Sequence, residues 1–164
     1  MKLDIGCGTS KHAGAHGVDR VALPGVDTVH DLNIFPYPFA DNSYDEIWLT
    51  DVIEHLNDTL AVMEEIYRIL QPGGVVHIKV VHWSHHHAYA DPTHVRFFGE
   101  EVWDFFTSKA RGYYTQAQFE LVEKKYAYDT TVKMFLPIPF ILNFLAYFLN
   151  NVLESVIVTL RKPL

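Results

Sequence analysis

Two glycines and an aspartate in the first turn of the chain could bring its backbone close to a ligand. In the run Asp4-Ile5-Gly6-Cys7-Gly8, the glycines permit a close approach and leave amide groups free to meet an anion. A dinucleotide fingerprint would place a third glycine at position 11, which is Lys11, and would place its acidic residue later than Asp19. The spacing therefore argues against a nicotinamide cofactor and keeps a site for another ligand.

Three histidines follow extended segments and are candidate catalytic bases. His55 comes after the segment 44–49, His82 comes directly after the segment 74–81, and His94 lies further on. An imidazole titrates near neutral pH and can accept a proton from an oxygen or nitrogen nucleophile. A structural or surface role stays open for each of them.

The segment from 82 to 94 is rich in histidine and invites a metal interpretation. It holds His82, His85, His86, His87 and His94, with Asp91 among them. Imidazoles and a carboxylate suit zinc, copper, nickel or non-haem iron. However, three consecutive histidines in an extended loop should point in different directions, and no pattern fixes two ligands on one helix face. We therefore expect no metal, and the loop is either a polar lid over the substrate or a solvated loop.

The scaffold for these residues is expected to alternate strands and helices. Strands are predicted at 2–5, around Val18, and at 28–30, 44–49, 74–81, 119–128 and 155–160. A helix capped by Asp58 is predicted from the spacing of Leu60, Met63, Ile66, Tyr67 and Leu70, and Gln71-Pro72-Gly73-Gly74 is expected to end it. Shorter helices are predicted at 99–107 and 140–149. This order predicts an α/β fold with a mostly parallel sheet, which binds ligands beyond the carboxyl ends of its strands.

Six ordered segments carry a resemblance to a known family. They are Leu3–Thr9, Gly17–Arg20, His30–Leu32, Asp41–Ile47, Asp51–Leu56 and Glu65–Gly74. In this order they resemble the class I S-adenosylmethionine-dependent methyltransferases, and in particular small type 11-like members without helices before the first strand. The resemblance is close over residues 1–81, includes a similar segment at Asp91–Phe98, and thins out beyond it.

The resemblance implies a Rossmann-like, doubly wound fold with a mostly parallel seven-stranded sheet and one antiparallel strand near the C-terminus. It implies S-adenosylmethionine as the cofactor and methyl transfer to a small-molecule acceptor that the sequence does not identify. The positions that match the family's cofactor site are Asp4, Gly6, Gly8, Asp19, Arg20, Asp31, Leu32, Thr50 and Asp51.

The same resemblance implies a role for most of these residues. Backbone groups near Gly6, Gly8 and Thr50 would hold the methionine end, and Asp4 would orient the loop or meet the ammonium group through water. Asp19 would accept both ribose hydroxyls, Asp31 would accept from the adenine amino group, and Leu32 would cover the ring. Asp19 and Asp31 could also be ordinary turn carboxylates.

Two departures from the family pattern keep other functions open. Met1 stands directly before the first strand, and only a short stretch separates Gly8 from Val18, so the first crossover helix is expected to be short or replaced by a loop. The cofactor site would then be unusually open. The alternatives are a non-catalytic S-adenosylmethionine-binding partner subunit and a metal-binding histidine-loop protein on the same fold.

Composition sets the remaining expectations. The 164 residues suit one methyltransferase-like domain, with a cofactor half at 1–81 and a substrate half at 82–164. A net charge of −7 disfavours nucleic acid, and the single cysteine, Cys7, suits a reducing compartment. The acidic start, Met1-Lys2-Leu3-Asp4, does not resemble a signal peptide, so we expect a cytoplasmic protein.

The C-terminal quarter is strongly apolar. Residues 134–153 carry no charge, but Pro137 and Pro139 interrupt the stretch and leave a helix too short to cross a bilayer. Its apolar residues are Phe135, Leu136, Ile138, Phe140, Ile141, Leu142, Phe144, Leu145, Tyr147 and Phe148. A homodimer through this helix is the favoured interpretation; a monomer in which the helix folds back, and peripheral contact with a lipid or an apolar substrate, stay open.

Overall fold

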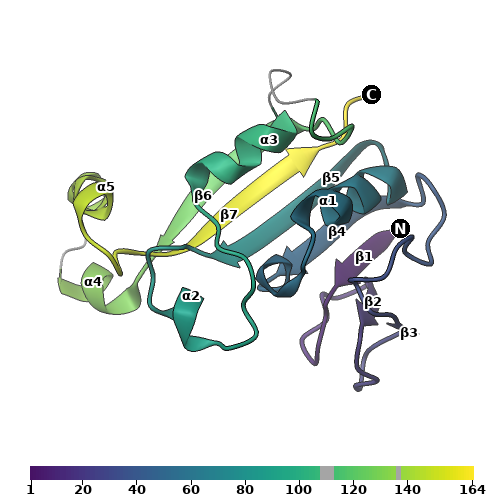
Figure 1. The fold of residues 1–164 in the computed structure, drawn as a ribbon, viewed down its shortest axis with the longest axis horizontal. Helices are drawn as coiled ribbons and strands as arrows, with labels where there is room; N and C mark the ends of the chain where they lie inside the picture. The colour runs from purple at the N-terminus through teal and green to yellow at the C-terminus, as the bar shows by residue number, and fades with distance from the viewer. Residues whose placement is uncertain (108–112, 136–137) are drawn as a thin grey trace.

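Seven strands form one mixed sheet in the computed structural model, which describes residues 1–107, 113–135 and 138–164. The strands are β1 (Lys2–Ile5), β2 (His16–Asp19), β3 (Thr28–Val29), β4 (Tyr44–Thr50), β5 (Leu70–Val81), β6 (Glu120–Tyr128) and β7 (Leu153–Arg161). They lie in the order β3-β2-β1-β4-β5-β7-β6 (Figure 1). The first five pair in parallel, whereas β7 is antiparallel to both β5 and β6. This confirms the expected sheet with one antiparallel strand near the C-terminus.

Short helices connect the strands. They are η1 (Ile53–His55), α1 (Thr59–Ile69), α2 (His87–Ala90), η2 (Glu100–Trp103), α3 (Asp104–Thr107), α4 (Thr130–Phe135) and α5 (Pro139–Phe148). The predicted cap of α1 is confirmed, because the Asp58 side chain accepts a hydrogen bond from the Ala61 amide at 3.0 Å. Pro139 is the first residue of α5, where its missing amide hydrogen costs nothing.

The region of α4 and the start of β5 differ from the expected element pattern. The helix α4 was not expected, because Thr130, Thr131 and Val132 favour an extended chain; Asp129 caps it by accepting from the Thr131 and Val132 amides. Strand β5 begins at Leu70 rather than at Gly74, so the Pro-Gly signal does not separate helix from strand. The sheet accommodates that signal through a register shift between Tyr44 and Glu46 on the neighbouring strand.

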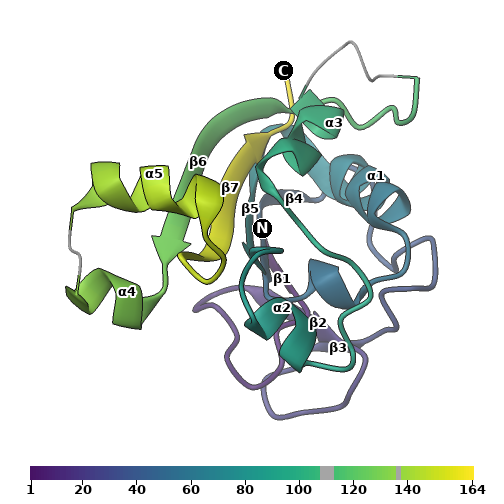
Figure 2. The same cartoon turned by 60° about the vertical axis from the view of Figure 1, so that its left-hand side comes forward.

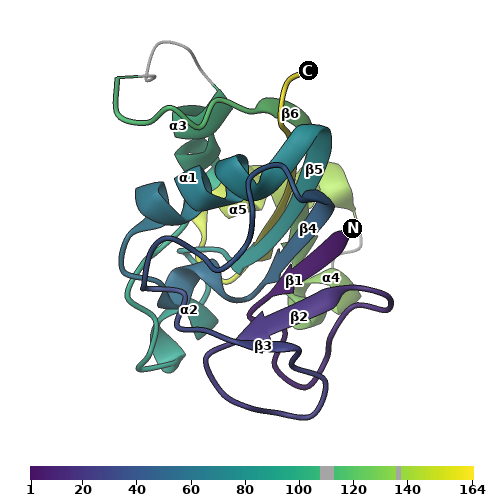
Figure 3. The ribbon, with the colours of Figure 1, turned by 90° about the vertical axis from the view of Figure 1, so that its right-hand side faces the viewer.

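One face of the sheet carries the core. Met63 and Ile66 of α1, with Trp103 and Phe106 farther along, pack against the sheet residues that alternate inward, such as Val76, Ile78 and Val80 of β5. Figures 1 and 3 show α1 and α3 on this face. Alternation along β5 therefore buries one side chain in two, as a sheet covered by helices on one face requires.

The opposite face is covered differently because β1 and β2 are joined by a loop over residues 6–15 without a helix. This confirms the expected loss of the first crossover helix. The ring of Trp48 stacks there between His12, at 4.9 Å, and His77, at 5.6 Å between ring centroids. Since these side chains are only partly buried, this face of β4 stays partly open to solvent.

The helices α4 and α5 are set apart from the core beyond the end of β6 (Figure 2). The predicted apolar helix is confirmed as α5, but most of its large side chains are exposed, whereas Leu142 is buried. Leu136 and Pro137 of the predicted apolar stretch lie outside the described residues. None of the helices in the described part of the chain is long and apolar enough to cross a membrane.

The cap of α1 gives a direct test of the helix start. Asp58→Ala removes the side-chain acceptor of the Ala61 amide and should lower the free energy of unfolding by about 1 kcal/mol. Asp58→Ser keeps an acceptor and should retain most of the stability. Urea denaturation of the three proteins would measure this, and equal stability of the alanine variant and the parent would contradict the role of the cap.

Candidate functional site

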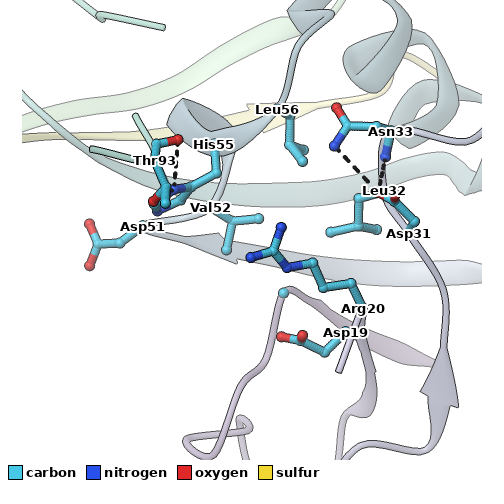
Figure 4. Close-up of a pocket in the computed structure, with 11 residues that line it drawn as sticks. Asp19, Arg20, Asp31, Leu32, Asn33, Asp51, Val52, His55, Leu56 and Thr93 are labelled. Atoms are coloured by element: carbon cyan, nitrogen blue, oxygen red, sulfur yellow. Dashed lines mark hydrogen bonds between the residues drawn. The ribbon is translucent and has the colours of Figure 1, made fainter. Parts of the chain in front are cut away.

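A cavity of about 240 Å³ opens at the carboxyl ends of β1, β2 and β4. Its lining consists of Gly6, Asp19, Arg20, Asp31, Leu32, Asn33, Asp51, Val52, His55, Leu56 and Thr93 (Figure 4). The strand order reverses between β1 and β4, and ligands of open α/β sheets bind at such a reversal. The cavity therefore lies where the sequence places a ligand.

The turn after β1 brings the backbone to the cavity wall at Gly6. Its φ of +68° is in the left-handed region, and a Cβ added there would lie 2.4 Å from the Cγ2 atom of Val52. Only glycine satisfies both constraints. The amides of Gly6 and Cys7 both donate to the Val18 carbonyl, and the Gly8 amide donates to Asp19. The expectation that this turn leaves those amides free for an anion is therefore wrong.

The carboxylate of Asp19 is held at the end of β2 by two backbone amides. Its Oδ2 atom accepts from the Gly8 amide and its Oδ1 atom from the Val21 amide, each at 3.0 Å. Each carboxylate oxygen has a second lone pair, so this fixed group can still accept two hydrogen bonds from a ligand. Figure 4 shows the Arg20 side chain reaching into the cavity between Asp19 and Leu32.

Asp31 presents a second carboxylate to the cavity. Its Oδ1 atom accepts from the backbone amide of Asn33 at 2.9 Å and from the Asn33 side chain at 3.3 Å. No hydrogen bond reaches its Oδ2 atom from the described residues. Asp31 is therefore oriented by its own turn through one oxygen, and the other can meet a donor on a ligand.

Three buried apolar side chains form the wall near Asp31. Leu32, Val52 and Leu56 line the cavity and come from the ends of different elements. The Tyr37 hydroxyl donates to the Leu32 carbonyl at 3.0 Å and fixes that backbone, and burial raises the pKa of Tyr37 well above its ordinary value. This part of the cavity suits an apolar or aromatic group of a ligand.

Asp51 follows β4 in a conformation that is costly for a residue with a Cβ. Its φ is +54°, and such strain is concentrated at functional sites. The Asp51 amide donates to the Lys79 carbonyl at 2.9 Å, and its carboxylate accepts from the Lys79 ammonium at 2.7 Å. These two contacts hold the strained turn that directs Val52 into the cavity.

Three predicted cofactor residues do not line the cavity. Asp4 is buried, and its Oδ2 atom accepts from the His12 amide at 2.7 Å and lies 2.9 Å from the His12 ring Nδ1. It therefore orients the loop, which is one of the two roles considered for it. The Gly8 amide orients the cavity residue Asp19 by donating a hydrogen bond to its carboxylate. Thr50 is the last residue of β4 and directly precedes Asp51, which lines the cavity.

The three candidate bases fall in different places. His55 lines the cavity, and the ring of His94 lies 4.7 Å from its ring in an edge-to-face arrangement. His82 is buried outside the cavity lining, with its Nδ1 atom 2.7 Å from the Ser84 hydroxyl. Burial lowers the pKa of His82, and Glu100, whose carboxylate lies 3.5 Å from the His82 Nε2 atom, partly opposes this.

The sequence suggested that the three consecutive histidines point in different directions, and this expectation is wrong. The rings of His85, His86 and His87 lie 4.2–4.6 Å apart, because the chain turns into α2 there instead of staying extended. His85 is fully buried with its Nε2 atom 3.3 Å from the Asp129 carboxylate, whereas the other two are exposed. None of the three lines the cavity.

Sequence reasoning missed four residues of the lining. Asn33, Val52 and Leu56 lie next to or within the segments that carry the resemblance, so their positions were a usable signal. Thr93 belongs to the segment Asp91–Phe98, whose contact with the cavity no spacing rule indicates. It arrives there because the Val95 and Arg96 amides both donate to the Glu54 carbonyl.

This chain is similar to known proteins in sequence and in structure. Residues 15–78 match the family described as Methyltransferase domain. Dimethylglycine N-methyltransferase of Parasynechococcus marenigrum is 45% identical over 47 residues, which are 29% of this chain and 17% of that protein. An Archaeoglobus fulgidus S-adenosylmethionine-dependent methyltransferase structure superposes with a TM-score of 0.71 at 16% identity, covering 98% of this chain and 85% of that one.

This chain has the class I methyltransferase fold. The Archaeoglobus fulgidus protein is described as dependent on S-adenosylmethionine. A second structure with this fold comes from a complex between the Haloferax volcanii Trm112 methyltransferase activator and a protein assigned as a methyltransferase. It has a TM-score of 0.65 at 18% identity and covers 99% of this chain and 82% of that one. The chain spans only 17% and 18% of the length of two of the curated relatives that it matches in sequence.

The contact between Gly6 and Val52 gives a test of the cavity wall. Gly6→Ala should lower the free energy of unfolding by more than ~2 kcal/mol, because it combines a left-handed backbone with a clash. Gly8→Ala, which has open space around its Cβ, should cost about 1 kcal/mol. The double variant Gly6→Ala/Val52→Ala should recover part of the loss. Denaturant unfolding would measure all three, and no recovery in the double variant would contradict the steric explanation.

Proposed function

We propose that this protein binds S-adenosylmethionine in the cavity and transfers its methyl group to a small-molecule acceptor. The observation that carries the proposal is the pair of oriented carboxylates, Asp19 and Asp31, beside an apolar wall at the strand reversal. A nucleoside needs this combination of hydrogen-bond acceptors and an apolar surface. We also propose that the chain works as one domain, with residues 1–81 binding the cofactor and 82–164 facing the acceptor, and that it works in the cytoplasm.

The residues present fit the cofactor. Asp19 would accept from the ribose hydroxyls, Asp31 would accept from the adenine amino group through its second oxygen, and Leu32 would cover the adenine. Gly6 would let the chain approach the methionine end, and the carbonyl near Thr50 would accept from its ammonium group at the end of β4, next to Asp51. Arg20 would meet the carboxylate or the ribose, since no hydrogen bond joins its side chain to another described residue.

His55 is the proposed catalytic base. When bound, the cofactor supplies a methyl group on a sulfonium, and its carbon–sulfur bond breaks with the electron pair passing to sulfur. As the acceptor oxygen or nitrogen bonds to the methyl carbon, the Nε2 atom of His55 would accept the proton that the acceptor loses. His94 would support or replace His55 in this role. His82 has no direct part in this proposal, because it is buried outside the cavity lining, whereas the ring of His94 contacts that of His55.

Calorimetry with S-adenosylhomocysteine tests the binding step. The protein should bind one equivalent, and Asp19→Ala should weaken the binding about tenfold or more, because it removes a charged hydrogen-bond acceptor. Asp19→Asn keeps an acceptor for the Gly8 amide and should weaken it less, and Glu123→Ala, at an exposed site on β6, should leave it unchanged. Absence of binding by the parent protein, or equal binding by Asp19→Ala, would contradict the proposed site.

The alternative is a non-catalytic S-adenosylmethionine-binding partner subunit. Two observations favour keeping it: the cavity volume is below the ~300–1,000 Å³ common for small-molecule sites, and one protein of this fold was solved with an activator. A search for S-adenosylhomocysteine release in the presence of cell extract separates the two. Release that His55→Ala abolishes supports the enzyme, whereas cofactor binding without release supports the partner subunit.

We propose further that α5 forms a homodimer interface. Its exposed large residues, with their neighbours, are Ile138, Phe140, Phe144, Tyr147, Phe148 and Leu149. A two-fold contact would bury the same apolar face on both copies, and no element of the described chain covers it. Contact with a lipid or an apolar acceptor is the second interpretation of this face.

Sedimentation at micromolar concentration tests the interface. The parent protein should sediment as a dimer, and Phe144→Asp should convert it to a monomer, because a carboxylate would be buried against apolar side chains. Leu121→Asp, at an exposed site on β6, serves as the matched control and should stay dimeric. A parent protein that is monomeric would contradict the dimer, and binding to liposomes would then favour the lipid interpretation.

A further inference from the structure

Three side chains next to the cavity form a cluster with the chemistry of a metal site. Glu54, His55 and His94 each offer one ligand atom, and these atoms all lie within 4.8 Å of one another. Glu54 and His55 belong to η1, whereas His94 comes from the segment after α2. Two imidazoles and one carboxylate are a common ligand set for Zn²⁺ and other divalent transition metals.

Hydrogen bonds place both imidazoles in the tautomer that a metal needs. The Nδ1 atom of His94 lies 3.0 Å from the Ala88 carbonyl, and that of His55 lies 3.3 Å from the Thr93 carbonyl. A carbonyl oxygen only accepts, so each Nδ1 carries the hydrogen. Each Nε2 atom therefore keeps its lone pair, as in metal-binding histidines oriented by a backbone or carboxylate partner.

A carboxylate also stands behind His55. The Thr93 hydroxyl donates to the Asp91 Oδ1 atom at 2.6 Å and therefore accepts from the His55 Nδ1 atom at 2.9 Å. The second oxygen of Asp91 lies 3.9 Å from the His94 Nε2 atom. Asp91 therefore orients one imidazole and adds negative charge beside the other, as the outer partners of metal sites do.

Glu54 has a buried carboxylate oxygen without a hydrogen-bond partner. Its side chain is 1% exposed, and its Oε2 atom has no hydrogen-bond partner. A buried carboxylate oxygen without a partner is costly, because the fold gives no compensation for its lost hydration. Among the buried side-chain atoms of the described residues, it is the one unpartnered carboxylate oxygen, and it belongs to the cluster.

The backbone holds the two halves of the cluster together. The Glu54 carbonyl accepts from the Val95 amide at 2.9 Å and from the Arg96 amide at 3.1 Å. The Arg96 guanidinium also donates to the Asn57 carbonyl just beyond η1. The segment with His94 is thus tied to η1 on either side of His55, and ligands on tied segments need little ordering when a metal binds.

We propose that Glu54, His55 and His94 bind one divalent transition metal ion at the edge of the cavity. Bonds of about 2.0–2.2 Å place ligand atoms roughly 3.3 Å apart in a tetrahedral site, so the three side chains would draw together by about 1.5 Å at most. Three protein ligands leave a coordination position, and His55 lines the cavity, so that position is at the cavity's edge. This departs from the expectation of no metal, and it rests on the geometry whether or not the proposed function holds. Because a bound metal would occupy the His55 Nε2 lone pair, His55 would act as the proposed base only in the metal-free protein.

Titration of untagged protein with Co²⁺ alone tests the site through its d–d absorption. One equivalent should bind to the parent, and Glu54→Gln and His94→Asn should each weaken binding about tenfold or more. The double variant His86→Ala/His87→Ala removes exposed imidazoles outside the site and should bind like the parent. Circular dichroism would check that the variants fold, and if Glu54→Gln does not, His94→Asn carries the test.

Two outcomes would overturn the proposal. One is a parent protein that binds no Co²⁺, and the other is binding that survives in Glu54→Gln and His94→Asn but is lost in His86→Ala/His87→Ala. Calorimetry with S-adenosylhomocysteine on the same sample keeps this separate from the proposed function. Co²⁺ binding without S-adenosylhomocysteine binding would leave the metal site standing and contradict the methyl-donor site.

Discussion

The parallel pairing of β1 with β2 on one side and β4 on the other is the constraint on which the site depends. Because the strands run in one direction, their carboxyl ends meet at one edge, and the segments that leave them supply Gly6, Asp19 and Asp51 to one cavity. No single segment contributes enough groups to hold a ligand. The register of these three strands therefore determines whether the side chains converge at all.

The convergence of these residues at the cavity requires local backbone strain and close packing. Gly6 lies against Val52 in a left-handed conformation, and Asp51 adopts a left-handed conformation although it has a Cβ. Lys79 of β5 stabilises the Asp51 turn through both its carbonyl and its ammonium group. The turn after β4 thus depends on the neighbouring strand as well as on its own residues, which links the cavity wall to the centre of the sheet.

Much of the fold followed from local patterns, whereas the site followed from them only in part. The strands and α1 were predictable because alternation, helical spacing and the Asp58 cap act over a few residues. The fate of the Gly6 and Cys7 amides was not, since the acceptor is the Val18 carbonyl on another strand. Position beside a strand likewise could not separate His55, which lines the cavity, from His82, whose ring is buried away from it.

The position of the segment with Thr93 and His94 could not be predicted from the sequence. Its contact with η1 depends on backbone hydrogen bonds between residues about forty positions apart, and backbone groups carry no sequence signal. The resemblance at Asp91–Phe98 showed that the segment was of interest without showing what it meets. Only the fold brings His94 to His55 and Glu54.

The position of β7 in the sheet affects how the chain is made. β7 follows β6 in the chain but lies between β5 and β6, so β6 has no partner strand until β7 has been synthesised. During translation the first five strands can pair as they emerge, whereas β6 has no partner strand at that stage. A ribosome that stalls before β7 would therefore expose a nine-residue strand to pairing with other chains. Once β7 has paired with both β5 and β6, only the outer edge of β6 stays open on this side of the sheet.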